Sequence, residues 1–451
     1  MRIGRDHQKL SSLSKDFNLE ALADGEIPRS VSEALKTSGR AKARSSPLHP
    51  RFVIWLTVGL MLWRHDSIAA VFGRLVSGMR GRLGDLSLKA VTDGALSHAR
   101  KRLGIEPLRR LFQQLAGAVS PATSFAGLKV WIIDGTFLTL QDTPENLRVF
   151  GRRNTPRGRA AFCELKMVCL VDATRHLIRD AVFGLWNFSE IPAAKRLIRH
   201  LCAGDLVILD RLFCGLPLLS AIRDQEVHFL CRASSHVRLK PIRGTRQGHQ
   251  YESWLTRRDM PPLRVRVIDF HLRGYGRIRL TTSLLDRVAY PAVELAVLYH
   301  SRWEAEIAFD EIKTHQNANA HGQIQTTFRS KTPRNVMQEA YAMLVAYNLV
   351  RRTMATAATE ARMDPRRLSF LNSLRAIQWM TPRMQSALSE ALPILYRQLL
   401  SDLIDMHLDR WRRHRAYPRV VRVKTVRFRV KHPEHHQIRQ NIEVLIRNAV
   451  A

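Results

Sequence analysis

The chain has 451 residues, 45% of them hydrophobic, and its 72 Lys and Arg residues against 39 Asp and Glu residues give a formal net charge of +33. This hydrophobic content excludes a mainly disordered chain, and the length predicts two to four domains rather than one compact core. So large a positive excess indicates a polyanionic partner, usually nucleic acid, although a generically basic protein such as a ribosome-associated one remains the alternative.

The cysteines and the apolar runs indicate the compartment. The five cysteines lie in apolar surroundings and form no CxxC pair, which is typical of reduced core residues and argues against a zinc site. The N-terminal residues contain no signal-peptide-like apolar stretch, and the longest apolar run, 52–63, is too short to span a bilayer. We therefore expect a cytoplasmic protein that acts at the chromosome, in association with the nucleoid.

Residues 1–125 predict a helical N-terminal domain. Asp66 and Asp93 are expected to be the N-caps of two short helices. The second of these helices carries the basic residues Arg100, Lys101 and Arg102. A pair of short helices with a basic second member is consistent with a helix-turn-helix that reads DNA. An ordinary helix bundle with a solvated basic face explains the pattern equally well.

From residue 126 to about 335 the pattern changes to that of a mixed sheet flanked by helices. Two apolar runs each end in an aspartate, at Asp134 and at Asp210, as buried strands would. Two strands between them are spaced to form a hairpin, and residues 235–280 form a small β insertion. Strand–strand–strand–helix–strand–helix is the order of an RNase H-like core, the α/β fold of polynucleotidyl transferases.

Residues 336–451 predict a helical C-terminal region. It includes a basic tail from Arg410 to Lys431, in which no acidic residue interrupts the cations and aromatic residues interleave them. Such a tail would bind the phosphate backbone of nucleic acid without regard to sequence. A charged tail without a role is the alternative.

One segment spaces four polar side chains on a common helix face. A helix from about 291 to 314 would advance about 100° per residue and bring the four within roughly 60° of one another. The four residues are Tyr299, Arg302, Glu306 and Lys313. Cations and a hydroxyl can hold phosphate oxygens, and a carboxylate can hold a metal ion. The segment therefore predicts a site that handles phosphodiesters.

Three carboxylates complete this site in our interpretation: Asp134, Asp210 and Glu306. Strand ends are where sites assemble in α/β sheets, and hard oxygen ligands favour Mg²⁺ or Mn²⁺. Two such ions can activate a water or 3′-hydroxyl nucleophile and stabilise the leaving oxygen of a phosphoryl transfer. Two assignments stay open, because Asp172 could replace Asp210 if it is not a hairpin-turn residue, and Asp310 could replace Glu306. Glu304 would point away from Glu306.

The spacing Y-x2-R-x3-E-x6-K resembles the signature of the "insertion element four" family of bacterial insertion-sequence DDE transposases. Ile133-Asp-Gly-Thr136 is similar to the family's first aspartate motif, and Leu209-Asp-Arg-Leu-Phe-Cys-Gly215 to its second. Residues 28–120 resemble its N-terminal domain, so that nearly the whole chain is covered.

The resemblance implies a DDE transposase whose C-terminal region helps to form a dimeric synapse. It assigns Asp134, Asp210 and Glu306 as metal ligands for Mg²⁺, which Mn²⁺ can replace. Tyr299, Arg302 and Lys313 would hold the DNA backbone near the scissile phosphate. Relatives cut through a hairpin intermediate and hold a flipped base on aromatic side chains, for which Trp303 and Trp254 are the candidates here.

The leading functional hypothesis is an enzyme that excises its own insertion sequence at the terminal inverted repeats and joins the 3′ ends to target DNA. One alternative is an inactive or domesticated relative that binds or nicks DNA without transposing. Another is a basic DNA-binding regulator whose acidic residues are structural. A regulator would bind DNA without a metal ion, and a nuclease would cut without joining the ends.

Overall fold

We describe a computed structural model of the protein. The described residues are 26–41, 48–77, 92–117, 123–155, 158–272, 276–317, 326–408, 415–416 and 440–450. Apart from residues 415–416, the expected basic tail lies outside them. None of the helices in the described ranges has the length and apolar character needed to cross a membrane.

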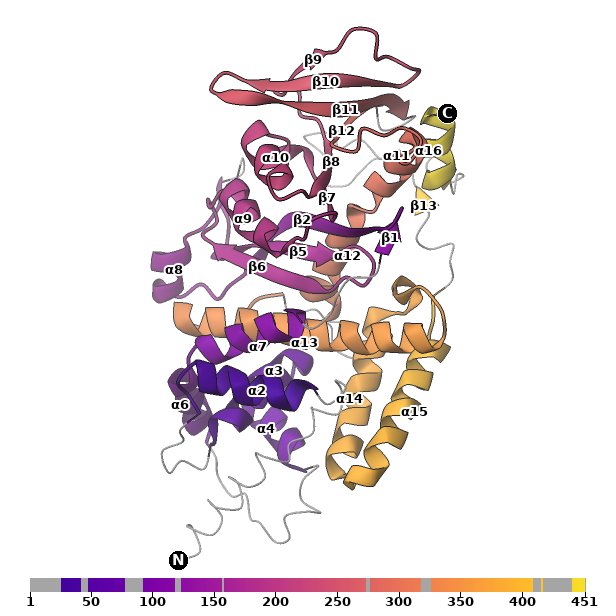
Figure 1. Ribbon diagram of the computed structural model, residues 1–451. Coiled ribbons are helices and arrows are strands. Elements are labelled where there is room, and N and C mark those ends of the chain that lie inside the picture. Colours follow the sequence, from indigo (N-terminus) through magenta and orange to yellow (C-terminus); the bar gives the residue numbers. More distant parts are fainter. Residues whose placement is uncertain are drawn as a thin grey trace, which may run out of the picture.

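A ten-stranded mixed sheet forms the centre of the upper half of the molecule (Figure 1). Its strands are β1 (Thr123–Phe125), β2 (Leu128–Thr139), β5 (Glu164–Asp172), β6 (Ile178–Gly184), β7 (Leu206–Leu209), β8 (His228–Arg232), β9 (Arg238–Pro241), β10 (Gln250–Arg257), β11 (Met260–Leu272) and β12 (Gly276–Thr282). Two small pairs lie outside it: β3 (Asn154–Thr155) with β4 (Gly158–Arg159), and β13 (Arg415–Ala416) with β14 (Gln440–Asn441).

The strand order confirms the expected RNase H-like core. The order is β6-β5-β2-β7-β8-β12-β11-β10-β9, with β1 beside β2. Strands β6, β5 and β2 are antiparallel, whereas β2, β7 and β8 are parallel. The β insertion continues the same sheet, because β12 pairs antiparallel with β8 and the other insertion strands follow it outward. The insertion strands therefore extend the sheet sideways beyond β8, which is the outermost of the three parallel strands.

Helices cover both faces of this sheet and build the lower half of the molecule (Figure 1). They are α2 (Glu26–Thr37), α3 (Pro50–Leu62), α4 (Ile68–Ser77), α6 (Asp93–Leu103), α7 (Glu106–Gly117), α8 (Pro144–Phe150), α9 (Glu190–Leu197), α10 (Leu216–Arg223), α11 (Ala292–His300), α12 (Trp303–Asp310), α13 (Pro333–Glu360), α14 (Phe370–Ser386), α15 (Leu392–Asp405) and α16 (Ile442–Val450).

The predicted N-caps of two N-terminal helices are wrong by one residue. The hydroxyl of Ser67 accepts the Ala70 N–H at the start of α4, and that of Thr92 accepts the Ala95 N–H at the start of α6. Serine and threonine are both favoured N-caps, because their hydroxyl groups can accept from a free amide of the first turn. Asp66 instead forms an ion pair with Arg74.

Alternation along β2 separates two hydrophobic cores. Val130 and Ile132 belong to a large core shared with α13 and the N-terminal helices, whereas Trp131 and Ile133 face α9 and α10. This alternation follows from the two-residue period of a strand. Helix α13 crosses beneath the sheet beside α7, which also contacts β6, and α3 and α2 lie below them (Figure 1). The divisions expected near residues 125 and 335 remain predictions.

Candidate active site

Asp134 and Asp210 lie side by side on adjacent parallel strands. Ile133 of β2 pairs with Leu209 of β7, and each aspartate is the next residue. Neighbouring strands are about 4.8 Å apart, so the two carboxylates share one edge of the parallel ladder. Asp210 follows its strand as predicted. The prediction that the first strand ends at Asp134 is wrong, because β2 continues to Thr139 along β5 after β7 has ended.

The signature segment is not one continuous helix. Helix α11 ends at His300, a tight turn at Ser301–Arg302 follows, and α12 begins at Trp303. In this turn the N–H groups of Ser301 and Arg302 bond to the carbonyls three residues earlier, at 2.8 and 3.1 Å. After α12 the chain continues as a π-helical turn over Glu311–His315. The common face expected from an uninterrupted helix is therefore replaced by three short segments.

Arg302 joins two of the predicted carboxylates. Its Nη1 donates to Asp134 Oδ2 at 3.1 Å, and its Nη2 donates to Glu306 Oε1 at 2.8 Å. Asp134 and Glu306 are thus brought to the same guanidinium from a central strand and from α12. Charge-assisted hydrogen bonds of this kind are the stronger class in proteins.

Burial and like charge perturb the Asp134 carboxyl group. Burial raises the pKa of Asp134 to about 6, and the nearby carboxylates of Glu306 and Asp210 act in the same direction. The Gly135 N–H and the Arg302 guanidinium oppose this rise. The three predicted acids are therefore close enough to interact electrostatically, although they come from β2, the end of β7 and α12.

The remaining signature residues surround these carboxylates. Lys313 Nζ donates to the hydroxyl of Thr136 on β2 at 2.8 Å. Burial raises the pKa of Tyr299, with a further contribution from the Cys231 thiol, so the phenol stays protonated and able to donate. Arg302 and Lys313 thus bond side chains of β2, Glu306 joins them through Arg302, and Tyr299 lies near enough to Arg302 and Asp210 to interact electrostatically.

Comparisons with known proteins give the family. Residues 126–349 match the Transposase DDE domain, and residues 17–113 match the Insertion element 4 transposase N-terminal domain. The Transposase InsG for insertion sequence element IS4 of Escherichia coli is 31% identical over 90% of this chain and 92% of its own. This chain belongs to the insertion element 4 family of DDE transposases. It is a DNA transposase, and thus a polynucleotidyl transferase and endonuclease.

Two further comparisons give weaker similarity. The Putative transposase InsZ of Escherichia coli is 26% identical over 46% of this transposase and 69% of its own length. The solved piggyBac transposase synaptic complex with hairpin DNA aligns with a TM-score of 0.44 and 11% identity, over 86% of this chain and 84% of that one.

The alternative carboxylates of this transposase are engaged elsewhere. Asp172 accepts the N–H groups of Thr174 and Arg175 in the β5–β6 turn, which is the hairpin-turn role expected for it. Asp310 accepts the Thr314 hydroxyl at 2.7 Å on an exposed side of α12. Glu304 points away from Glu306, as predicted, toward His176.

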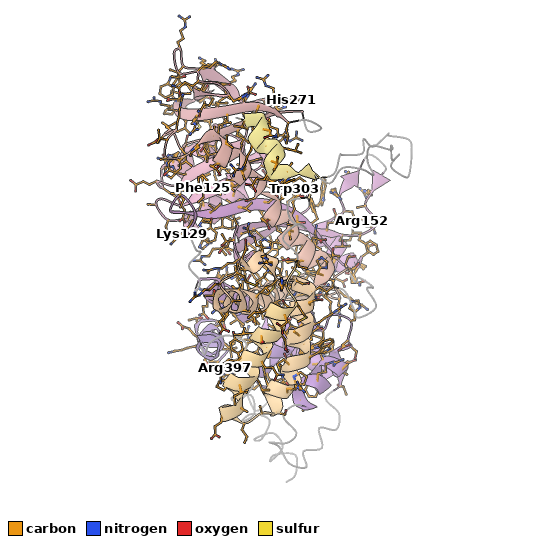
Figure 2. The ribbon with its side chains drawn as sticks, turned by 90° about the vertical axis from the view of Figure 1, so that its right-hand side faces the viewer. Phe125, Lys129, Arg152, His271, Trp303 and Arg397 are labelled. Carbon is orange, nitrogen blue, oxygen red and sulfur yellow. The ribbon has the colours of Figure 1, made fainter. Side chains whose placement is uncertain are left out.

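The other predicted DNA contacts fall into two groups. Trp303 is exposed at the start of α12, where Figure 2 shows it near α16, and the Arg302 guanidinium lies 5.0 Å from its ring centre. Lys101 and Arg102 are exposed on α6. Arg100 is only 8% exposed, and its Nε donates to Gln338 of α13. The prediction of a DNA-facing side chain is therefore wrong for Arg100, because α13 covers that side of α6.

One close contact behind the site has little signal in the sequence. An added Cβ on Gly135 would lie 2.8 Å from the carboxyl carbon of Glu190, so glycine leaves room for that side chain on the opposite face of β2. Glu190 forms an ion pair with Lys166 at 3.4 Å. Only an Asp–Gly pair in the sequence marks this close approach.

The carboxylates fit a divalent cation in their chemistry. Among the described residues, no three metal-ligating side chains already converge as a finished metal site. The Arg302 guanidinium lies between the largely buried Asp134 and the more exposed Glu306 and supplies positive charge to both carboxylates. Hard carboxylate oxygens that need a neutralising cation are the donor set of Mg²⁺ and Mn²⁺.

Proposed function

We propose that Asp134, Asp210 and Glu306 are the catalytic residues with which this transposase cuts the terminal inverted repeats of its own insertion sequence and joins the 3′ ends to target DNA. One observation carries the assignment: Arg302 bonds both Asp134 and Glu306 beside Asp210, although these acids lie far apart in the sequence. A guanidinium that bonds two carboxylates holds them close together, as acids that act on the same phosphate must be held.

The three carboxylates would hold Mg²⁺, or Mn²⁺ in its place, as two ions. Bound there, such ions activate the water or 3′-hydroxyl nucleophile and stabilise the leaving oxygen. The protein's own contribution is to fix the acids: Asp134 through the Gly135 N–H at 2.8 Å, and Asp210 through the Arg211 N–H at 2.6 Å. Both carboxylates are thereby oriented before substrate arrives.

The neighbouring polar groups would hold the DNA backbone. Arg302 already lies between two of the acids, so it is placed to contact a phosphate that approaches them. The protonated Tyr299 hydroxyl and the Lys313 ammonium can each donate to phosphate oxygens. Trp303 at the surface, with Lys101 and Arg102 on α6, would extend the contact away from the chemistry.

Partners and location follow from this activity as proposals. The DNA partners would be the terminal inverted repeats and the target. Two protomers would pair in a synaptic complex, and the protein would associate with the nucleoid in the cytoplasm. A charge of +33 supports a DNA partner. No observation favours an inactive relative or a regulator, because all three acids are present and interact.

The assignment is tested with purified protein, Mn²⁺ and a DNA fragment that spans the gene and both flanks. We expect new 3′-hydroxyl ends at a pair of inverted repeats. Asp134→Ala, Asp210→Ala and Glu306→Ala should each lower cleavage by at least about a thousandfold, since groups that act as a unit fail together. End binding, measured by gel shift in EDTA, should stay nearly unchanged.

Asp310→Asn is the matched control, because it removes an exposed carboxylate from the same helix as Glu306. It should cut the ends as the wild type does. Cleavage that survives one of the alanine substitutions would remove that residue from the triad. Binding without any cleavage by the wild-type protein would favour a regulator or an inactive relative.

A further inference from the structure

A groove of about 900 Å³ opens beside Asp210 on the side of the β insertion. Its walls come from the turn after β7, the end of β8 with the following loop, and β12. Its charged lining consists of Asp210, Arg211, Arg232, Arg277 and Arg279. The groove therefore begins at a proposed catalytic carboxylate and leads to cations that the signature segment does not include.

The arginines that line this groove outnumber the carboxylates that lie close to them. Arg277 binds the Asp269 carboxylate through two hydrogen bonds of 2.8 and 2.6 Å, and Arg279 shares that carboxylate at 3.5 Å. Across the described ranges, neither Arg211 nor Arg232 forms an ion pair with a carboxylate. Among the residues that the structure describes, the four guanidinium groups thus have the carboxylates of Asp210 and Asp269 beside them, so the groove is suited to an anionic ligand.

The two arginines of β12 are held in place before any ligand arrives. Asp269 of β11 lies directly opposite Arg279 in the antiparallel ladder, and Arg277 is two residues along the same face. A guanidinium that a carboxylate already orients loses less rotamer freedom when it binds a phosphate. At the mouth, Leu212 is 59% exposed and provides an apolar wall beside these cations.

We propose that this groove binds the phosphodiester backbone of the DNA strand that is cut, next to the scissile phosphate. The proposal rests on the assignment of Asp210 to the catalytic site. Arginine recognises phosphate through paired N–H groups, and a volume of this size lies within the range of specific ligand sites. Since the lining changes from a carboxylate at one end to guanidinium groups beyond it, the strand would run from Asp210 toward β12.

The test measures DNA binding by the full-length protein in EDTA, so that no cleavage is required. The probe is the shortest fluorescent duplex from the gene's flank that the wild-type protein retains in a gel shift. Arg211→Gln and Arg232→Gln are the test variants, because neither leaves a carboxylate without its partner. Arg264→Gln is the control: this exposed arginine belongs to the same insertion, pairs with Glu252 at 2.6 Å and points to the opposite face of the sheet.

Each test variant should reduce the slope of log Kd against log salt concentration by about 0.9, the value for one lost phosphate contact. The control should keep the wild-type slope. An unchanged slope in both test variants would overturn the proposal. Thermal melting shows whether each variant is folded, and exposed Arg211 offers the substitution least able to disturb folding.

Neutral methylphosphonate linkages then locate the contact. Replacing one phosphate at a time near the cut should weaken wild-type binding about tenfold where a charge-assisted contact is lost. At one such phosphate Arg232→Gln should show no further loss, because the pair is already broken. Full additivity at every phosphate would overturn the proposal. A wild-type protein that binds but never cuts would instead contradict the catalytic assignment. The salt-dependence slopes of the variants would still show whether the groove binds the DNA backbone.

Discussion

The ionised carboxyl group of Asp134 lowers the stability of the folded protein, although its charge is what the proposed phosphoryl transfer requires. It is largely buried and has Glu306 and Asp210 as electrostatic neighbours, so that burial and repulsion outweigh the Gly135 N–H and Arg302. Carboxyl groups perturbed in this way cluster at catalytic sites, where the charge is needed in the presence of ligands. The folded protein without bound cations therefore carries a destabilising charge above pH 6.

Asp134→Asn is accordingly expected to stabilise the protein at neutral pH. The folded-state pKa of about 6 lies above the ordinary 3.8, so the folded state binds more protons than the unfolded state between these values. Wild-type stability therefore falls as the pH rises through this window. Because asparagine does not titrate, the difference in free energy of unfolding between variant and wild type should grow by about 1–3 kcal/mol between about pH 4 and about pH 6.

Urea denaturation in EDTA across this pH range measures that difference. Asp310→Asn is the matched substitution of the same residue type, because it changes an exposed carboxylate close to Glu306 on the same helix. A difference for Asp134→Asn that stays flat with pH would show that its carboxyl group is not perturbed by burial.

Individual residues were predictable where a local pattern marks them. Asp134 and Asp210 follow apolar strand sequences, and the spacing of Tyr299 to Lys313 is specific to a family, so each could be chosen from the sequence. Arg100 could not be judged in the same way. Its burial depends on Gln338, which is distant in the sequence and packs against it only in the folded chain.

Helix α12 is held in place by a buried polar network on the side opposite the active site. Glu311 accepts from Arg351 Nε at 3.0 Å and from the Tyr347 hydroxyl at 2.9 Å. Arg351 Nη2 donates to His176 Nδ1 at 2.6 Å, since a guanidinium can only donate. His176 Nε2 lies 2.6 Å from Glu304 Oε2 of α12. The network connects α12 and the π-helical turn to α13 and to the β5–β6 turn.

Breaking one member of this network should destabilise the protein strongly. Burial alone would raise the pKa of Glu311, but Arg351 and His176 lower it to about 2, so the carboxylate is charged inside the protein. Arg351→Met would leave that charge without its partner and is expected to lower the free energy of unfolding by about 3–5 kcal/mol. Chemical denaturation with urea at pH 7 measures this loss.

The double variant Glu311→Leu with Arg351→Met is the informative comparison. It removes both charges, so it should recover most of the stability lost in the single variant. If the double variant is as unstable as the single one, the network does not act through its charges.

The type of each helix or strand in the catalytic region, and their order along the chain, were predictable from the sequence, but the interruption within the predicted helix 291–314 was not. The succession of strands along the chain and the β insertion follow from apolar runs and alternation, which are local properties. The interruption at Ser301–Arg302 contains neither glycine nor proline, the residues that usually mark a helix end. Arg302 lies in this interruption and bonds Asp134, which is distant in the sequence, and a count of 100° per residue cannot detect a contact of this kind.

Helix α13 joins all parts of the molecule. It is buried on every side along Met343–Val350, which is typical of a helix at the centre of a protein rather than at its surface. Asn348 bonds the N–H and the carbonyl of Ile178 at the edge of the sheet, at 3.0 and 2.9 Å. Glu339 forms a buried ion pair with Arg64 at 2.8 Å, which ties the helix to the N-terminal region.

The position of the groove beside Asp210 could not be predicted from the sequence, because it depends on how distant strands are arranged in the whole molecule. Its arginines come from the turn after β7, from β8 and from β12, and antiparallel pairing of β12 with β8 brings them together. In the sequence they are four cations among 72 Lys and Arg residues. A high net charge predicts an anionic partner without indicating where that partner binds.

The shared core predicts that the catalytic domain expected at 126–335 does not fold alone. This fragment lacks nearly all of α13, so the sheet face that carries Val130 and Ile132 would be exposed. Each large apolar side chain that loses its cover forfeits about 1.5–3 kcal/mol, and a few such losses exceed the stability of an ordinary domain. The full chain should unfold in calorimetry without a separate transition for the N-terminal helices, and the fragment should lack a cooperative transition. A fragment that melts cooperatively would establish an independent domain and restore the boundary at 335.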